Sequence, residues 1–381
     1  IPSEGSVGEA DILLASHVGA VMIGEWRAMK DGVVLSGKNA LRKANLSALV
    51  PEGKDALAIL SNNSVAMAYA IDATRNVAKV LAVTPTVYAM SLEGLNGNVA
   101  PILPQTIGAR PFPMLAETAA DMRAALNGSY LWEKNATRPL QDPLSYRVTV
   151  YGLVVDVQIN STDDNPATLL NATDEYRAES SQVADYFVDG DSVHGAIIPS
   201  GNFNPLPVAL AIQRMSLAMA HLSHYAVERT MHLSYDQFTH LPRFLAAEGN
   251  VGHAFGAVQK AFTGLHVDTM SLAQPVSLYG VPVAGEIEDT FTNLLQASQR
   301  LQKIDSNMMQ VMSLELLHAT QAIDLRRQKD ASLKLSQDTQ VLFDTYRKAV
   351  PFVERDRIFT DDIAAGTKIL NDLANKTLSQ K

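Results

Sequence analysis

The sequence predicts an all-α protein, built as a bundle of long helices. Hydrophobic residues make up 47% of the 381 residues and aromatic residues only 6%, so the apolar content comes mainly from Ala, Leu, Val and Met. Apart from Val, these are good helix formers. Apolar residues also recur at helical spacing through residues 55–90, 206–232 and 286–332. Helices of that length are typical of a long bundle or a helical oligomer core.

The chain opens on a glycine-bracketed loop, residues 1–11, in which Gly5 and Gly8 mark a tight turn. Such a loop before a helix aims backbone N–H groups at an anion, although an ordinary loop-to-helix junction has the same pattern. We expect an amphipathic helix over residues 15–30 that ends at the turn pair Asp31-Gly32. Residues 32–36 are β-like and could form one arm of a small hairpin.

The remaining elements follow from breaks in the apolar pattern. Prolines between residues 101 and 113 separate the first long helix from a predicted helix over 114–126. Residues 139–175 are irregular and rich in turn formers, which is typical of a functional segment when the apolar content is this high. Residues 331–381 are polar and charged at both signs, and we expect a solvated peripheral helix pair there. The predicted domains are 1–330 and 331–381.

Composition limits the classes of partner. The chain has 31 basic and 40 acidic residues, a net charge of −9, which argues against nucleic acid or an anionic membrane surface as partner. It has neither a long apolar span nor a signal peptide, and it has no cysteine, which excludes disulfides and thiolate chemistry. We predict a cytoplasmic location. Because the chain begins at Ile1 and enters a packed-looking loop at once, we expect it to be the later part of a longer protein.

Several polar groups interrupt apolar segments. Ser61 and Asn62 lie inside an apolar helical pattern, where they either form a polar kink or face a ligand. Gln141, Tyr146 and Arg147 bring an amide, a phenol and a guanidinium within seven residues. Arg147 could clamp a carboxylate through two hydrogen bonds, or it could form a surface ion pair.

Two further groups lie at predicted helix starts. Phe203 and Asn204 directly precede the helix at 206, so Phe203 is either a core residue or a ligand-facing wall. Glu288, with Glu286 and Asp289, is predicted at the start of the last long helix, where acidic residues suit the helix dipole. His221 and His224 lie three residues apart on a predicted helix without a third ligand nearby in sequence, so we expect no metal site.

Taken in order, these motifs resemble the aromatic amino acid lyase family, which includes histidine and phenylalanine ammonia-lyases. The resemblance covers residues 1 to about 330. It rests on Gly5-Ser6-Val7-Gly8 with Asp11 and His17, Leu57-Ala58-Ile59-Leu60, Gln141-Asp142-Pro143 with Ser145 and Arg147, Asn160-Ser161 with Asp164-Asn165-Pro166, Gly201-Asn202-Phe203, Glu228-Arg229, and Pro275, Ser277, Pro282 and Glu288-Asp289.

The resemblance implies an all-α fold of the ammonia-lyase type, whose long helices form the core of a homotetramer with active sites assembled from several subunits. It also implies an earlier segment, outside this chain, that carries a catalytic tyrosine on a mobile loop. In ammonia-lyases an Ala-Ser-Gly triplet between the positions of Gly8 and Asp11 cyclises into an electrophilic methylidene-imidazolone. Here only Glu9 and Ala10 fill that gap. Without a serine to dehydrate or a glycine nitrogen to close the ring, we expect no such cofactor.

Other departures from the family pattern agree with this loss. Ser61-Asn62 stands in place of the family's Asn-Gly, Leu144 in place of a Tyr, Asn204 in place of a His, and Ile287 in place of a Gln. Arg147, Phe203 and Glu288 match the family. Such a site keeps its anchor for the substrate carboxylate and loses its electrophile, which suggests a leaving group that needs no activation.

A quaternary ammonium meets this requirement, because trimethylamine leaves as a neutral base. Glu9 would attract such a cation in a partly dry pocket. The variant thus resembles the ergothionase branch of the family, and the predicted function is a carbon–nitrogen lyase that eliminates trimethylamine from a zwitterionic betaine such as ergothioneine. The predicted catalytic residues are Glu9 and Glu288, and the predicted substrate-binding residues are Ser61, Asn62, Gln141, Tyr146, Arg147, Phe203 and Asn204. The alternative is a catalytically silent scaffold or regulatory subunit of the same fold.

Overall fold

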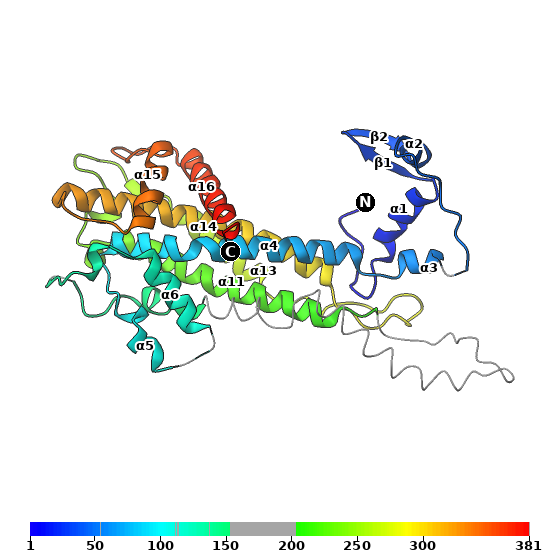
Figure 1. Ribbon diagram of the computed structural model, residues 1–381, viewed down its shortest axis with the longest axis horizontal. Coiled ribbons are helices and arrows are strands. Elements are labelled where there is room, and N and C mark those ends of the chain that lie inside the picture. Colours follow the sequence, from blue (N-terminus) through cyan, green and yellow to red (C-terminus); the bar gives the residue numbers. More distant parts are fainter. Residues whose placement is uncertain (54, 111, 113, 137, 153–202, 381) are drawn as a thin grey trace. The chain divides into compact units, whose positions relative to one another are not determined.

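The computed structural model describes residues 1–381 except 54, 111, 113, 137, 153–202 and 381. Helices dominate the described part (Figure 1), which confirms the predicted all-α class. The chain divides into two compact units. The first unit comprises Ile1–Ala73, Thr162–Gln213 and Pro275–Gln299, and the second comprises Thr74–Ser161, Arg214–Gln274 and Arg300–Lys381. The predicted boundary at residue 330 stays a prediction.

The first unit begins with short elements around the N-terminal loop. These are α1 (Ile12–Met22), β1 (Arg27–Lys30), β2 (Val33–Ser36), α2 (Gly37–Lys43) and α3 (Asp55–Leu60).

The helix that we expected over residues 15–30 ends at Met22, so the prediction of helix for residues 23–30 was wrong. Residues 27–30 instead pair antiparallel with 33–36, in the register that sets Lys30 opposite Val33. Asp31 and Gly32 close this hairpin with φ angles of 52° and 77°, as a two-residue turn between antiparallel strands requires. The suggested hairpin is therefore confirmed.

Three long helices contribute to both units: α4 (Ser64–Leu95), α11 (Leu206–Leu233) and α14 (Leu294–Lys329). The second unit also contains η1 (Ala100–Ile102), α5 (Pro104–Gly108), α6 (Leu115–Ala125), η2 (Tyr130–Trp132), α7 (Leu144–Arg147), α12 (Asp236–Thr239), η4 (Arg243–Leu245), η5 (Ala254–Gly256), α13 (Gln259–Leu272), α15 (Gln337–Ala349) and α16 (Thr360–Leu378). The helix α6 confirms the prediction for residues 114–126.

The core of the second unit is formed by the long helices, which run side by side there (Figure 1). Their buried apolar residues recur three or four positions apart, so one stripe of each helix faces the others. These residues include Val80, Val83 and Val87 of α4, Leu222 and Ala226 of α11, and Ile304, Met308 and Val311 of α14.

The start of α14 differs from the prediction. The helix begins at Leu294, and the preceding residues form a turn in which Val283 and Glu288 exchange two backbone hydrogen bonds of 3.0 and 3.3 Å. Glu286 has a φ of 70° and Asn293 a φ of 49°, which a right-handed helix does not allow. The expectation that Glu286, Glu288 and Asp289 begin a long helix was therefore wrong.

The helices α15 and α16 confirm a helix pair near the C-terminus, but the pair is only partly solvated. Phe343, Tyr346 and Leu370 are buried, and the hydroxyl of Ser313 on α14 donates to the carbonyl of Ile363 on α16 at 2.8 Å. Both helices are thus amphipathic and pack on the second unit. No described helix combines the length and the apolar character that crossing a lipid bilayer requires.

Candidate functional site

The N-terminal loop is docked onto the segment that precedes α14. The Val7 carbonyl accepts hydrogen bonds from the backbone N–H groups of Thr292 at 3.2 Å and Asn293 at 3.0 Å, and the Gly8 carbonyl accepts from the Thr292 hydroxyl at 2.6 Å. Gly8 has a φ of 93°, and a Cβ there would lie 2.1 Å from the Thr292 Oγ1 atom. The docked loop therefore requires glycine at this position.

Asp11 holds the other end of the loop and is fully buried. Its backbone N–H donates to the Asn62 carbonyl at 2.7 Å, and its Oδ2 atom accepts from the Ala66 N–H at 2.8 Å. This carboxylate satisfies one of the free N–H groups in the first turn of α4, where the helix dipole favours a negative charge. Glu9 is thus fixed between two anchored residues, Gly8 and Asp11.

Glu9 is 8% exposed, and one of its oxygens receives two hydrogen bonds. The Oε1 atom accepts from the Thr290 hydroxyl at 3.2 Å and from the Asn204 side-chain amide at 3.4 Å. The other end of the Asn204 amide accepts from the Leu206 N–H at 2.8 Å, at the start of α11. This second bond orients the amide so that its NH₂ group faces Glu9.

The structure therefore brings Glu9 and Asn204 together, two of the residues predicted from the sequence. Sequence reasoning missed Thr290. The available signal was its position directly after Glu288-Asp289, because residues next to a suspected site motif lie close to the same site.

Neutral donors and a second carboxylate surround Glu9 in the part of the chain that the structure describes. Burial raises the pKa of Glu9, the hydrogen bond from Thr290 lowers it, and the nearby Glu288 carboxylate raises it. Glu288 thus lies near enough to act on the charge of Glu9, and the catalytic role predicted for both residues stays a prediction. Among the described residues, no Lys or Arg side chain forms an ion pair with Glu9.

The break between α3 and α4 contains Ser61 and Asn62. The Asn62 amide donates to the Ile59 carbonyl at 2.6 Å and accepts from the Ser64 N–H at 3.0 Å, so it holds the break and supports the polar-kink interpretation. Ser61 is half-buried in the same break, and its predicted substrate contact stays a prediction.

Phe203 lies next to this break. The Asn63 amide donates to the Phe203 carbonyl at 2.5 Å, and Phe203 is 42% exposed. Phe203 is therefore not a core residue in this chain, which leaves its predicted role as a wall of the site open. The sequence motifs Gly201-Asn202 and Asn160–Pro166 lie outside the described residues.

The predicted residues of the Gln141–Arg147 motif belong to the second unit. Tyr146 is 1% exposed, its hydroxyl donates to the Arg229 carbonyl at 3.2 Å, and it lies 3.1 Å from the Ser91 Oγ atom. Both the ring and the hydroxyl are therefore engaged inside the unit, and the predicted substrate contact of Tyr146 stays a prediction.

Arg147 remains suited to an anion. It is half-buried, and its buried Nε atom has no hydrogen-bond acceptor among the described residues. The preceding Asp142 accepts from the Asn98 N–H at 2.6 Å, and burial raises the pKa of Asp142 to about 6 against the opposing effects of Asn98, Arg138 and Arg147. Gln141 is exposed. The predicted roles of Gln141 and Arg147 in substrate binding stay predictions.

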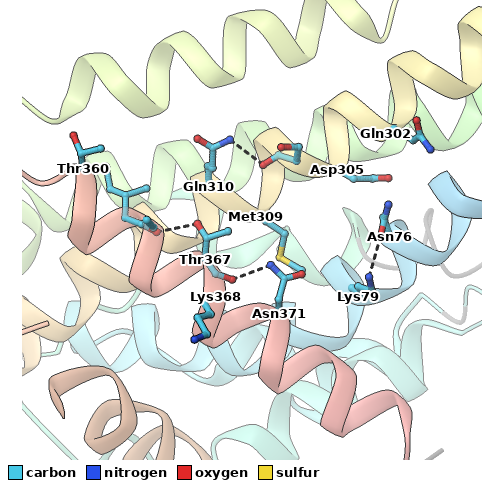
Figure 2. A pocket seen from close by; sticks show the side chains of 13 residues that line it. Asn76, Lys79, Gln302, Asp305, Met309, Gln310, Thr360, Thr367, Lys368 and Asn371 are labelled. Carbon is cyan, nitrogen blue, oxygen red and sulfur yellow. Dashed lines mark hydrogen bonds between the residues drawn. The ribbon is translucent and has the colours of Figure 1, made fainter. Parts of the chain in front are cut away.

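The second unit also contains a cavity of about 710 Å³ between α4, α14 and α16, shown in Figure 2. Most of its lining residues are of polar types, and its charged residues are Lys79, Lys368 and the buried Asp305. None of the site residues predicted from the sequence lines it. Within the described ranges, no group of three or more His, Asp or Glu side chains could hold a metal ion.

Comparison with known proteins identifies the family to which the chain is similar. A family described as "Aromatic amino acid lyase" matches residues 1–348. Histidine ammonia-lyase of Koribacter versatilis is 31% identical over 389 residues, which cover 97% of this chain and 72% of that protein. Histidine ammonia-lyase of Chloroflexus aurantiacus is 30% identical, over 94% of this chain and 68% of that protein.

Solved structures show the same fold. Ergothionase from Treponema denticola, an ergothioneine-degrading enzyme solved with desmethyl-ergothioneine sulfonic acid, matches with a TM-score of 0.84 and 29% identity, covering 99% of this chain and 73% of that chain. Histidine ammonia-lyase from Trypanosoma cruzi matches with a TM-score of 0.80 and 21% identity, over 100% of this chain and 70% of that chain. From the fold, the matched segment and the order of its motifs, this chain belongs to the aromatic amino acid lyase family.

Proposed function

We propose that this member of the family is a carbon–nitrogen lyase that eliminates trimethylamine from a betaine of a histidine derivative such as ergothioneine. The observation that carries the proposal is Glu9, a buried carboxylate whose hydrogen-bond donors among the described residues, Thr290 and Asn204, are both neutral. A buried carboxylate without a positive partner is costly, and a bound cation removes that cost.

The methylidene-imidazolone of ammonia-lyases does not fit this loop. Its formation needs a serine and a glycine between the positions of Gly8 and Asp11, and the residues there are Glu9 and Ala10. Gly8 and Asp11 are each fixed by backbone and side-chain hydrogen bonds, so no neighbouring serine can take the missing place without undocking the loop. We therefore propose an elimination that uses no such cofactor.

The reaction is a 1,2-elimination. A base removes a proton from the carbon that bears the imidazole ring, a carbon–carbon double bond forms, and the carbon–nitrogen bond breaks with its electron pair on nitrogen. Trimethylamine then leaves as a neutral molecule and the base keeps the proton. We expect this base on a part of the family outside the match, since the chain spans 68–73% of the length of the relatives described above.

Two residues of this chain are proposed separately for the two charges of the substrate. Glu9 attracts the trimethylammonium group, and Arg147 is assigned to the carboxylate because its buried Nε has no acceptor among the described residues. The two side chains belong to different compact units, so the assignment of Arg147 does not depend on that of Glu9. We also expect the family's homotetramer, which light scattering of the purified protein measures.

The test is an assay of the full-length protein with ergothioneine. We expect release of trimethylamine together with the absorbance of the conjugated product, and no release of ammonia from histidine as the matched control. Ammonia from histidine at a comparable rate would contradict the proposal. Silence with both substrates, and no rise of Tm with any betaine, would favour the alternative of a catalytically silent scaffold.

A further inference from the structure

We infer that Thr290 and Asn204 are specificity-determining residues that make the site of Glu9 prefer a fully methylated ammonium over an ammonium with an N–H group. The inference rests on the proposed function, because it concerns how the same site chooses among cations. Each residue donates one hydrogen bond to the same oxygen of Glu9.

The first step of the argument is the hydrogen-bonding capacity of Glu9. A carboxylate accepts hydrogen bonds at both oxygens. The Oε1 atom already accepts from Thr290 at 3.2 Å and from Asn204 at 3.4 Å. The protein therefore fills the acceptor sites of one oxygen before a ligand arrives.

The second step is the chemistry of the competing cations. A trimethylammonium group has no N–H, so it interacts with Glu9 by charge and contact alone. A dimethylammonium or primary ammonium donates hydrogen bonds, and on entering the site it gives up bonds to water while Oε1 is already occupied, so that only Oε2 is left to accept from it. Such a ligand pays a desolvation cost that the trimethylated ligand does not have.

The third step is that the two donors are independent of each other. Thr290 lies in the turn before α14, whereas Asn204 is fixed at the start of α11 by its bond to the Leu206 N–H at 2.8 Å. Removing the Thr290 hydroxyl therefore opens one acceptor site on Oε1 and leaves the Asn204 amide in place.

The experiment compares the full-length wild type with T290V, which keeps the size of the side chain and removes its donor. The probes are glycine betaine and N,N-dimethylglycine, which differ by one methyl group and cannot eliminate because they lack a second carbon that bears a proton. We expect the ratio of their Kd values in calorimetry to shift toward dimethylglycine by about tenfold, the size expected of one hydrogen bond to a charged group. T290S, which restores the hydroxyl, is expected to restore the wild-type ratio.

The same shift is expected in kcat/KM for the trimethylated and dimethylated forms of the thiol-substituted histidine. T263V, at an exposed threonine of α13 whose hydroxyl donates to the Gln259 carbonyl, is the matched control and leaves both ratios unchanged. An unchanged ratio in T290V, a T290S variant that behaves like T290V, or no binding of either probe to the wild type overturns the inference.

The proposed function fails on a different result. It fails when the wild-type enzyme releases no trimethylamine from ergothioneine, whatever the two Kd values are. Trimethylamine release with an unshifted T290V ratio overturns the specificity inference and leaves the proposed function standing.

Discussion

Glu9 in the first unit and Glu315 in the second are both buried carboxylates, but the protein treats their charges in opposite ways. Glu315 receives a bidentate pair from Arg229, with Oε1 at 2.6 Å from Nε and Oε2 at 2.8 Å from Nη2. Both side chains are almost completely buried. Glu9 has neutral donors on one oxygen and a second carboxylate, Glu288, nearby.

We interpret the charge of Glu315 as structural, and we propose that the charge of Glu9 is available to a ligand. Arg229 also donates to the Thr149 hydroxyl at 2.6 Å and lies over the Tyr88 ring, 5.6 Å from its centroid. The charged groups of Arg229 and Glu315 each have partners within the protein, so this network fixes the packing of α4, α11 and α14. Glu9 has only neutral hydrogen-bond donors within the described residues, as we expect of the proposed cation site before its ligand binds.

The largest effect that we predict is in the paired carboxylate. R229M leaves the Glu315 charge buried without its partner, which typically costs about 3–5 kcal/mol of unfolding free energy. The double variant R229M/E315L removes both charges and is expected to recover most of that loss. Urea denaturation measures both variants. If R229M and the double variant are equally unstable, the lost packing of Arg229 and not the unpaired charge causes the effect.

His318 tests a third way of burying an ionisable group, which is to keep it neutral. It is fully buried, it lies against Phe255 and Phe262 with ring centroids 4.7 and 5.7 Å away, and burial lowers the pKa of His318 to about 4. The unfolded chain then binds a proton below its ordinary pKa of 6.5, whereas the folded chain does not until about 4.

Stability should therefore be fully present above pH 6.5 and should fall as the pH drops toward 4, by up to about 3 kcal/mol. In H318F this part of the acid loss disappears, because phenylalanine does not titrate. Urea denaturation at several pH values measures the slope, with H224Q at an exposed histidine as the control. A slope that H318F leaves unchanged assigns the acid loss to other groups.

Removing the charge of Glu9 should weaken ligand binding and should leave the folding stability unchanged. E9Q removes the charge but keeps the size and the hydrogen bonds, so we expect glycine betaine to bind at least about tenfold more weakly, a change of about 1.4 kcal/mol. E4Q, at an exposed glutamate of the same loop, is the control in the calorimetric titration. Unchanged affinity in E9Q would remove Glu9 from the proposed function.

Much of the fold followed from the sequence, because helical periodicity and turn dipeptides are local signals. The helices α6 and α11 and the hairpin turn at Asp31-Gly32 are examples. The predicted start of α14 was wrong because acidic residues occur both at helix N-termini and in turns. Here they lie in a turn, in which Gly285 has a φ of 70° and Val283 pairs with Glu288.

The site was harder to predict, because its contacts join residues far apart in sequence. Glu9 was found from a departure in a family motif, but its donor Thr290 lies 281 positions away along the chain. No local pattern marks such a pair. Nor does the motif around Tyr146 indicate that this side chain is buried and hydrogen-bonded to Ser91 and Arg229, which are also distant in sequence.

The smallest predicted effect concerns the charge of Glu288. Its carboxylate raises the pKa of Glu9, so E288Q should lower that pKa and keep Glu9 ionised at lower pH. Because only the ionised form attracts a cation, the affinity for glycine betaine should then persist further into acid in E288Q than in the wild type. Calorimetric Kd values across the acid range measure the midpoint without depending on turnover. D289N removes a neighbouring charge of the same kind and is the matched control, and a midpoint that rises in E288Q would show that Glu288 does not repel the charge of Glu9.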